Sequence, residues 1–156
     1  MQETQQSELY GLRNLLVNLE LPPKSAWFNM GLWDRPNLNY SQACQNLVRE
    51  VTEQCAIQPN SSILDVGFGC GDSCLFLAEH YQSKVKGITN EQSQLTVANK
   101  RIPDHLKEQI ALILGSADDL STYTSSEKHD AVLSIDSAYH FNTRWDFLRN
   151  AFDCLK

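Results

Sequence analysis

The sequence predicts an α/β fold built on a doubly wound parallel sheet. Four short segments are expected to be strands, at residues 63–66, 84–89, 109–114 and 130–136, and they alternate with segments of helical periodicity. The third expected strand is apolar along its length, which is typical of a strand covered on both faces. A glycine-rich turn joins the first expected strand to a helix. Strands and helices that alternate in this way form right-handed crossovers, and a ligand crevice is expected at the carboxyl ends of the strands.

The turn after the first strand contains Gly67, Gly69 and Gly71. Glycine allows a sharp turn here and lets main-chain N–H groups and the helix N-terminus approach a ligand closely. Asp72 or Ser73 is expected to cap the helix that follows. The spacing is Gly-x-Gly-x-Gly, which differs from the Gly-x-Gly-x-x-Gly of dinucleotide-binding turns. The turn favours a nucleotide-like cofactor, and a βα turn without a ligand stays open as the alternative.

Length and charge limit the classes of protein to consider. A chain of 156 residues with 42% hydrophobic content is long enough for one domain with a core. Residues 1–40 are expected to form an N-terminal helix and an aromatic cover segment, and residues 41–156 the cofactor-binding domain. The net charge of -6 disfavours nucleic acid as a partner, because it provides no basic surface for a phosphate backbone.

The cysteines and the N-terminus indicate a reducing compartment. The five cysteines are odd in number and form no Cys-x-x-Cys pair, so reduced, buried thiols and no metal site are expected. The first eight residues are polar and acidic, without the basic and apolar regions of a signal peptide. No apolar run approaches the length of a membrane span, so a cytoplasmic protein without stable membrane insertion is expected.

The N-terminal 40 residues are expected to cover the domain. Four leucines recur at helical spacing ahead of a Pro-Pro pair that ends the helix: Leu9, Leu12, Leu16 and Leu19. The aromatic cover segment, residues 25–34, then concentrates three large aromatic side chains without a clean period. Packing of this segment on the domain and contact with a ligand are both open interpretations.

Further helices are expected between and after the strands. One begins after Asn39, since Gln42 three residues later completes a capping box. Others are expected over residues 90–101 and 143–155, while the polar residues 121–129 are expected to form a mobile loop. The last helix has four apolar side chains on one side: Trp145, Leu148, Phe152 and Leu155.

The end of the second strand has two interpretations. A ribose-binding fold usually places an acid here, whereas this chain has Thr89 followed by Asn90. Thr89 and Gln92 also match a Thr-x-x-Gln capping box, so a helix cap without a ligand is the alternative.

The order and spacing of these motifs resemble the class I S-adenosylmethionine-dependent methyltransferases. The similar branch includes cyclopropane fatty acid synthases and several small-molecule methyltransferases, and the similarity runs from about Ala26 to the end. It rests on Phe28–Trp33, Asp65 with the glycine turn, Gly87-Ile-Thr89 with Gln94, Gly115–Asp118 and Ser134–Phe141. The resemblance implies a Rossmann-like sheet, S-adenosylmethionine as the cofactor, and methyl transfer to an O, N or C atom of a small molecule.

The resemblance implies a role for residues after the first two strands. Asp65 would support the turn, and the backbone of residues 67–71, including Phe68, would meet the methionine part of the cofactor. Thr89 and Gln94 would take the ribose hydroxyls in place of the usual acid.

It also implies contacts for the adenine. Ser116 and Ala117 would flank the ring, and Ile135 would pack nearby. Ser116 replaces the acid or aromatic residue often seen there, and Asn90, also expected at the cofactor, stands where the branch often has an apolar residue.

Tyr139 and His140 follow the fourth strand, where an acceptor would lie against the methyl group. A neutral imidazole can take a proton from a hydroxyl or an amine, so His140 is the candidate base. A histidine packed at the start of the last helix is the alternative. In the cyclopropane synthases an acid that binds bicarbonate precedes this histidine, and Tyr139 occupies that position here. The resemblance therefore favours methyl transfer over cyclopropanation.

The resemblance also predicts a truncated chain, because the class I sheet has seven strands and four are evident. The fourth strand would form an exposed edge, through which self-association is expected. A noncatalytic module that acts through a partner and a nicotinamide-dependent enzyme are the competing functional classes.

Overall fold

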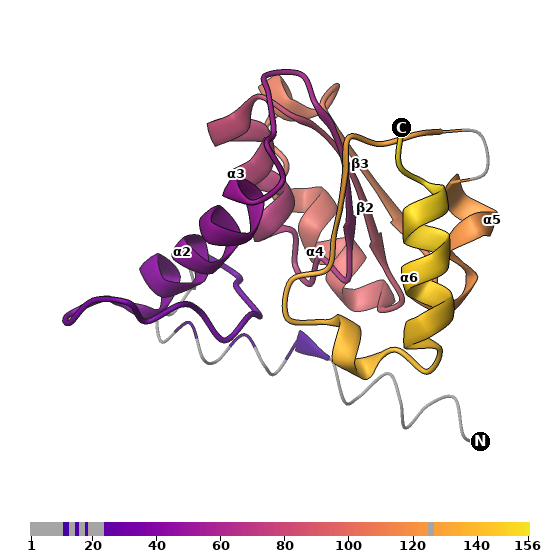
Figure 1. Cartoon of the computed structure of the whole chain (residues 1–156). Coiled ribbons are helices and arrows are strands. Elements are labelled where there is room, and N and C mark those ends of the chain that lie inside the picture. The colour runs from indigo at the N-terminus through magenta and orange to yellow at the C-terminus, as the bar shows by residue number, and fades with distance from the viewer. Residues whose placement is uncertain (1–10, 13–14, 16–17, 19–23, 125–126) are drawn as a thin grey trace.

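The computed structural model describes residues 11, 12, 15, 18, 24–124 and 127–156, so most of the predicted leucine helix lies outside the described residues. Helices and strands follow one another along the rest of the chain (Figure 1). Their bounds are α2 Tyr40–Glu53, β1 Ser62–Val66, α3 Asp72–Tyr81, β2 Lys84–Thr89, α4 Gln92–Arg101, η2 Asp104–Leu106, β3 Ile110–Leu114, η3 Ala117–Asp119, α5 Leu120–Thr124, β4 Ala131–Leu133, η4 Ala138–His140 and α6 Arg144–Asp153.

The strands form one parallel sheet in the order β3-β2-β1-β4. Val66 pairs with Ile88, and Thr89 pairs with Leu114, so β1, β2 and β3 end at nearly the same level. The segments that follow these strands therefore lie together at one edge of the sheet. The predicted α/β parallel fold is confirmed.

Helices cover both faces of the sheet. In Figure 1, α2 and α3 lie on the left of the strands, and α5 and α6 on the right. Successive β1 side chains enter different cores, since Ile63 packs with the α2, α3 and α4 side while Leu64 and Val66 pack with the α5 and α6 side. Each of these side chains is almost completely buried, which stabilises the fold by about 1.5–3 kcal/mol per residue. The sheet is therefore doubly wound.

The predicted capping box at the start of α2 is confirmed. Asn39 Oδ1 accepts a hydrogen bond from the Gln42 backbone N–H at 2.9 Å, and Gln42 Oε1 accepts one from the Asn39 N–H at 3.0 Å. Two helix-terminal donors are thereby satisfied at the point where the cover segment passes into α2.

The fourth strand is shorter than the predicted residues 130–136. It ends at Leu133, where its pairing with β1 stops opposite Asp65, and Asp136 further on has a left-handed backbone conformation with φ of 56°. The prediction of a mobile loop over residues 121–129 is also wrong in part. Thr124 Oγ1 donates to the Leu120 carbonyl and both residues are buried, so part of this polar sequence forms α5.

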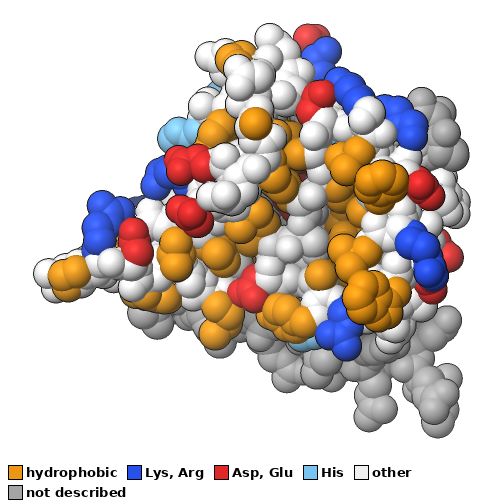
Figure 2. Space-filling view, in the orientation of Figure 1, with side chains coloured by type: hydrophobic (Ala, Val, Ile, Leu, Met, Phe, Trp, Pro, Cys, Tyr) orange, Lys and Arg blue, Asp and Glu red, His pale blue; other side chains and the backbone are white. Residues whose placement is uncertain are grey.

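The last helix packs on the sheet with one face and exposes another. Phe147, Ala151 and Cys154 are buried. Trp145 and Phe152 expose 77% and 74% of their surface, so the predicted apolar side of α6 points outward. Figure 2 shows hydrophobic side chains along the α6 side of the molecule, next to Lys and Arg side chains.

The segment ahead of β4 pairs with residues that follow α6. The His129 N–H donates to the Cys154 carbonyl at 2.8 Å, and the Lys156 N–H donates to the His129 carbonyl at 3.1 Å. Leu155 thus forms a parallel bridge with His129. This bridge precedes β4, so among the described residues the outer edge of Ala131–Leu133 has no strand partner, and self-association through it stays a prediction.

Candidate active site

Three glycines turn the chain from β1 into α3 with left-handed backbone conformations. Gly67, Gly69 and Gly71 have φ of 87°, 61° and 91°. A Cβ at Gly67 would lie 2.5 Å from Ser137 Oγ, and one at Gly71 would lie 2.9 Å from Ala98 Cβ. The fold itself therefore requires glycine at these positions, in addition to any need for close approach to a ligand.

The predicted cap of α3 by Asp72 or Ser73 is wrong. Gly71 is the N-cap residue and offers no side chain. Both predicted caps bind elsewhere: the Asp72 carboxylate accepts hydrogen bonds from the Arg101 guanidinium, and Ser73 Oγ donates to Asp65.

Asp65 links the end of β1 to the first turn of α3. Its Oδ2 accepts hydrogen bonds from Ser73 Oγ at 2.5 Å and from Cys74 Sγ at 3.4 Å. The carboxyl group is buried, and this burial raises the pKa of Asp65. The side chain is therefore placed to hold the turn rather than to face solvent.

Thr89 and Gln94 form a buried pair between β2 and α4. Thr89 Oγ1 donates to Gln94 Oε1 at 2.7 Å. The N-cap of α4 is Glu91, whose carboxylate accepts from the Ser93 N–H at 3.1 Å. The Thr89–Gln92 capping box is therefore wrong, because Gln92 is the first helical residue.

A chamber of about 1000 Å³ opens at the carboxyl edge of the sheet. Segments that follow all four strands contribute to its lining, together with the cover segment. The predicted site residues that line it are Gly67, Gly69, Thr89, Asn90, Gln94, Ser116, Ala117, Tyr139 and His140. The structure therefore brings together most of the residues singled out in the sequence.

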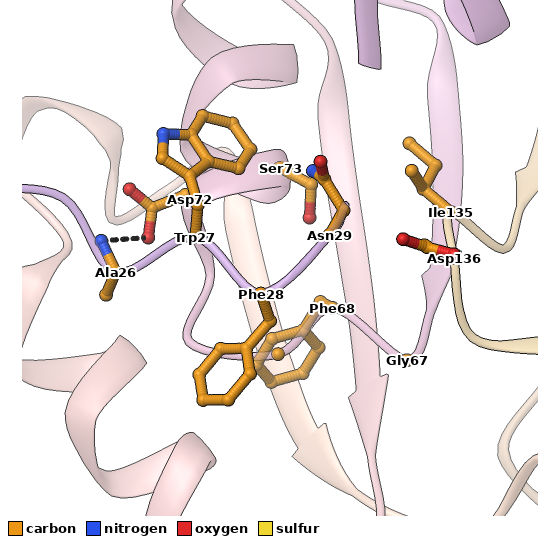
Figure 3. A pocket seen from close by; sticks show the side chains of 11 residues that line it. Ala26, Trp27, Phe28, Asn29, Gly67, Phe68, Asp72, Ser73, Ile135 and Asp136 are labelled. Atoms are coloured by element: carbon orange, nitrogen blue, oxygen red, sulfur yellow. Dashed lines mark hydrogen bonds between the residues drawn. The ribbon is translucent and has the colours of Figure 1, made fainter. Parts of the chain in front are cut away.

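A smaller cavity of about 50 Å³ adjoins the chamber (Figure 3). Phe68 and Ile135 line this cavity, and Phe28 and Asp136 line both spaces. Asp65 and Gly71 line neither, so direct contact of these two with a cofactor stays a prediction.

Several lining residues were not predicted from the sequence. Tyr40 reaches the chamber from the start of α2, and Asp118, Asp136 and Ser137 reach it from loops after β3 and β4. Asp118, Asp136 and Ser137 follow strand ends, and this position is a sequence signal for a site residue. No local pattern marks Tyr40.

Asp118 links η3 to the segment ahead of α6. It accepts hydrogen bonds from Thr143 Oγ1 at 2.7 Å and from the Thr143 N–H at 3.1 Å. These bonds, the Oγ1 bond foremost, lower the pKa of Asp118. One wall of the chamber is fixed in this way.

Tyr139 and His140 lie in η4, with ring centroids 4.2 Å apart and tilted by 53°. Both are exposed and both line the chamber. The alternative position for His140, at the start of the last helix, is wrong because α6 begins at Arg144 with Thr143 as its N-cap.

The thiols are not arranged as nucleophiles. All five cysteines are free, and four of them are buried. Burial raises the pKa of Cys70, in the glycine turn, to about 12. A thiolate is therefore disfavoured beside the chamber.

The family model described as a methyltransferase domain matches residues 63–156. The chain belongs to the class I S-adenosylmethionine-dependent methyltransferases. Erythromycin 3''-O-methyltransferase of Saccharopolyspora erythraea is 30% identical over 139 residues, covering 88% of this methyltransferase and 45% of the relative. O-methyltransferase rstn1 of Aspergillus nomiae is 28% identical over 129 residues, covering 81% and 56%.

Solved structures agree with this fold. The [4+2]-cyclase SpnF superposes with a TM-score of 0.80 at 24% identity, covering 97% of this methyltransferase and 56% of that chain. The cyclopropane synthase MmaA2 from Mycobacterium tuberculosis superposes with a TM-score of 0.78 at 20% identity, covering 94% and 50%. The chain thus spans about half the length of the curated relatives it matches.

The residues present fit the cofactor that this family implies. Gly67 and Gly69 line both cavities, so the glycine turn lies between the two spaces. Thr89 and Gln94 line the chamber, with polar atoms that can bind a sugar hydroxyl. The family and this geometry favour S-adenosylmethionine over a nicotinamide cofactor.

Proposed function

We propose that this methyltransferase transfers a methyl group from S-adenosylmethionine to a hydroxyl oxygen of a small molecule. The observation that carries the proposal is the single chamber that joins the ends of the strands to η4 and the cover segment. The choice of oxygen is supported by the relatives whose names describe O-methyltransferases.

The cofactor would lie along the carboxyl edge of the sheet. Its methionine part would occupy the smaller cavity, against the glycine turn with Phe68 and Ile135. Its ribose would bind Thr89 and Gln94, with Asn90 adjacent, and Ser116 and Ala117 would flank the adenine. The remaining volume, next to η4, would receive the acceptor.

When bound, S-adenosylmethionine supplies a methyl group already activated on a sulfonium cation. The chain itself has to align the acceptor, exclude water and receive a proton. His140 would accept the hydroxyl proton on its imidazole, and Tyr139 would hold that ring by packing against it.

The lining of the chamber indicates an apolar acceptor without an anionic group. Three carboxylate side chains line the chamber: Glu91, Asp118 and Asp136. The described lining contains no Lys or Arg. Apolar and aromatic side chains form much of the remaining wall: Phe28, Met30, Trp33, Tyr40 and Phe141. A carboxylate or phosphate on the acceptor would meet repulsion here.

The test combines binding and turnover. Calorimetry with S-adenosylhomocysteine measures the cofactor site, and radiolabelled methyl transfer to paired alcohols and carboxylates measures the acceptor. His140→Asn is expected to slow transfer by about 10²–10⁴-fold, as loss of a general base does, with unchanged S-adenosylhomocysteine affinity. His105→Asn is the matched control, because His105 is an exposed histidine of η2 outside the chamber. Equal rates for His140→Asn and wild type would contradict the base.

A noncatalytic role through a partner is the second candidate, and the named relatives disfavour it because all are enzymes. We also propose that the chain associates with itself through the free edge of β4. A cytoplasmic location and the lack of a nucleic-acid partner are further parts of the proposal. None of the helices in the described part of the chain is long and apolar enough to cross a membrane. Sedimentation at increasing concentration tests the association.

A further inference from the structure

Asp136 occupies the boundary between the two cavities. It lies three residues after the end of β4 and lines both the chamber and the smaller cavity. Its φ of 56° is a left-handed conformation, which costs an L-residue about 1–2 kcal/mol, although Asp tolerates it better than most. A side chain kept at this cost is a candidate for a specific role.

The Asp136 carboxylate holds the cover segment by its backbone. Its Oδ2 accepts a hydrogen bond from the Met30 N–H at 2.6 Å, across 106 residues of sequence. Figure 3 shows this side chain beside Ile135, turned toward the part of the cover segment that carries Asn29. Charge-assisted hydrogen bonds of this kind are short and strong.

A second carboxylate holds the same segment four residues earlier. Asp72 Oδ2 accepts from the Ala26 N–H at 3.1 Å, drawn as a dashed line in Figure 3. Asp72 is itself paired with Arg101. None of the ion pairs among the described residues includes Asp136.

The α2 side of the segment is held by its carbonyls. Tyr40 Oη donates to the Asn29 carbonyl at 2.8 Å, and Cys44 Sγ donates to the same oxygen. The cover segment is therefore fixed between α2 and the end of β4, with Asp136 as the contact on the β4 side.

The position of Met30 determines that of a large aromatic side chain. Trp33 Nε1 donates to the Met30 carbonyl at 2.9 Å. Both side chains line the chamber and both are exposed. Movement of the Met30 backbone would therefore displace an apolar wall of the chamber.

We propose that Asp136 is a positioning residue that fastens the cover segment to the end of β4 and sets the Met30 and Trp33 wall of the acceptor space. This inference rests on the proposed function in one respect only, namely that the space beside Met30 and Trp33 receives the acceptor. The hydrogen bond between Asp136 and the Met30 N–H is a property of the folded chain and can be measured without turnover.

Two variants separate the hydrogen bond from the backbone strain. Asp136→Gly removes the carboxylate and suits the positive φ, so the fold is not strained by the change. Asp136→Asn retains an oxygen acceptor and also tolerates this conformation. The glycine variant is therefore expected to release the cover segment, and the asparagine variant to retain it.

Hydrogen exchange of a peptide that covers Met30 measures, in the full chain, how strongly Asp136 holds the cover segment. Asp136→Gly is expected to raise its exchange by about tenfold, the effect of one lost hydrogen bond. Asp136→Asn is expected to stay within about threefold of wild type. Wild-type exchange in the glycine variant, or equal acceleration in both variants, would overturn the proposal.

Cofactor affinity distinguishes a positioning role of Asp136 from a direct effect of its negative charge on the cofactor. Asp136→Asn is expected to bind S-adenosylmethionine and S-adenosylhomocysteine in the wild-type ratio, because a positioning hydrogen bond is preserved. A selective loss of S-adenosylmethionine would overturn the positioning role, since it would show that the negative charge acts on the sulfonium. Failure of the wild type to bind either ligand would instead contradict the proposed function, with the exchange result unaffected.

Discussion

Replacement of Thr89 and Gln94 tests the ribose contacts that we propose for these two residues. Thr89→Val keeps the branched shape buried at the end of β2 and removes only the hydroxyl that donates to Gln94 at 2.7 Å. One hydrogen bond is worth about 0.5–1.5 kcal/mol, so each of Thr89→Val and Gln94→Ala should weaken S-adenosylhomocysteine binding about 2- to 12-fold. The two residues bind each other, so the double variant should lose less than the sum of the two free energies.

Calorimetry gives the affinities, and urea unfolding gives the stability of each variant. Thr96→Val is the matched control, because Thr96 is an exposed α4 residue whose Oγ1 donates to the Gln92 carbonyl at 2.8 Å. It should leave the affinity unchanged. If Thr89→Val binds S-adenosylhomocysteine as tightly as the Thr96→Val control does, the ribose assignment is refuted.

Two further predictions concern folding. Burial raises the pKa of Asp65, so the folded chain holds its proton to higher pH than the unfolded chain, and the free energy of unfolding falls as pH rises from the ordinary pKa through the raised one. Asp65→Asn should remove this fall, measured as the wild-type minus variant difference in urea unfolding across that range; parallel curves would contradict it. On α6, Phe147→Ala should lower the free energy of unfolding by about 3–5 kcal/mol because Phe147 is buried. Phe152→Ala should change it by no more than about 0.5 kcal/mol because Phe152 is exposed. Similar losses for the two variants in chemical denaturation would reject this assignment of the helix faces.

Local patterns account for the parts of the fold that were predicted. The apolar runs give the strands, and a capping box over four consecutive residues gives the start of α2. The capping box is accessible to sequence reasoning because a single turn forms it. The family resemblance, and no local pattern, singles out Thr89 and Gln94, since the local pattern predicts a Thr89–Gln92 cap that the structure does not form.

Competition from partners outside the first turn of α3 accounts for the wrong prediction of its cap. Asp72 and Ser73 have the residue types of helix caps, but Arg101 and Asp65 bind their side chains. The return of Leu155 to the edge of the sheet has no local signal either, since it depends on where α6 ends. Local propensity yields to tertiary contacts at these sites.

The two parts of the chamber differ in the sequence range of the contacts that build them. The cofactor side depends on pairs that are close in sequence, such as Asp65 with Ser73 and Thr89 with Gln94. The proposed acceptor side depends on a contact that spans 106 residues, from Met30 to Asp136. A second long-range contact, from Ala26 to Asp72 across 46 residues, holds the same cover segment beside the smaller cavity. Motifs record short-range pairs, so they favour the cofactor that we propose. The acceptor wall forms only when the cover segment docks on the finished sheet, and its chemistry therefore has to be determined from the assembled structure.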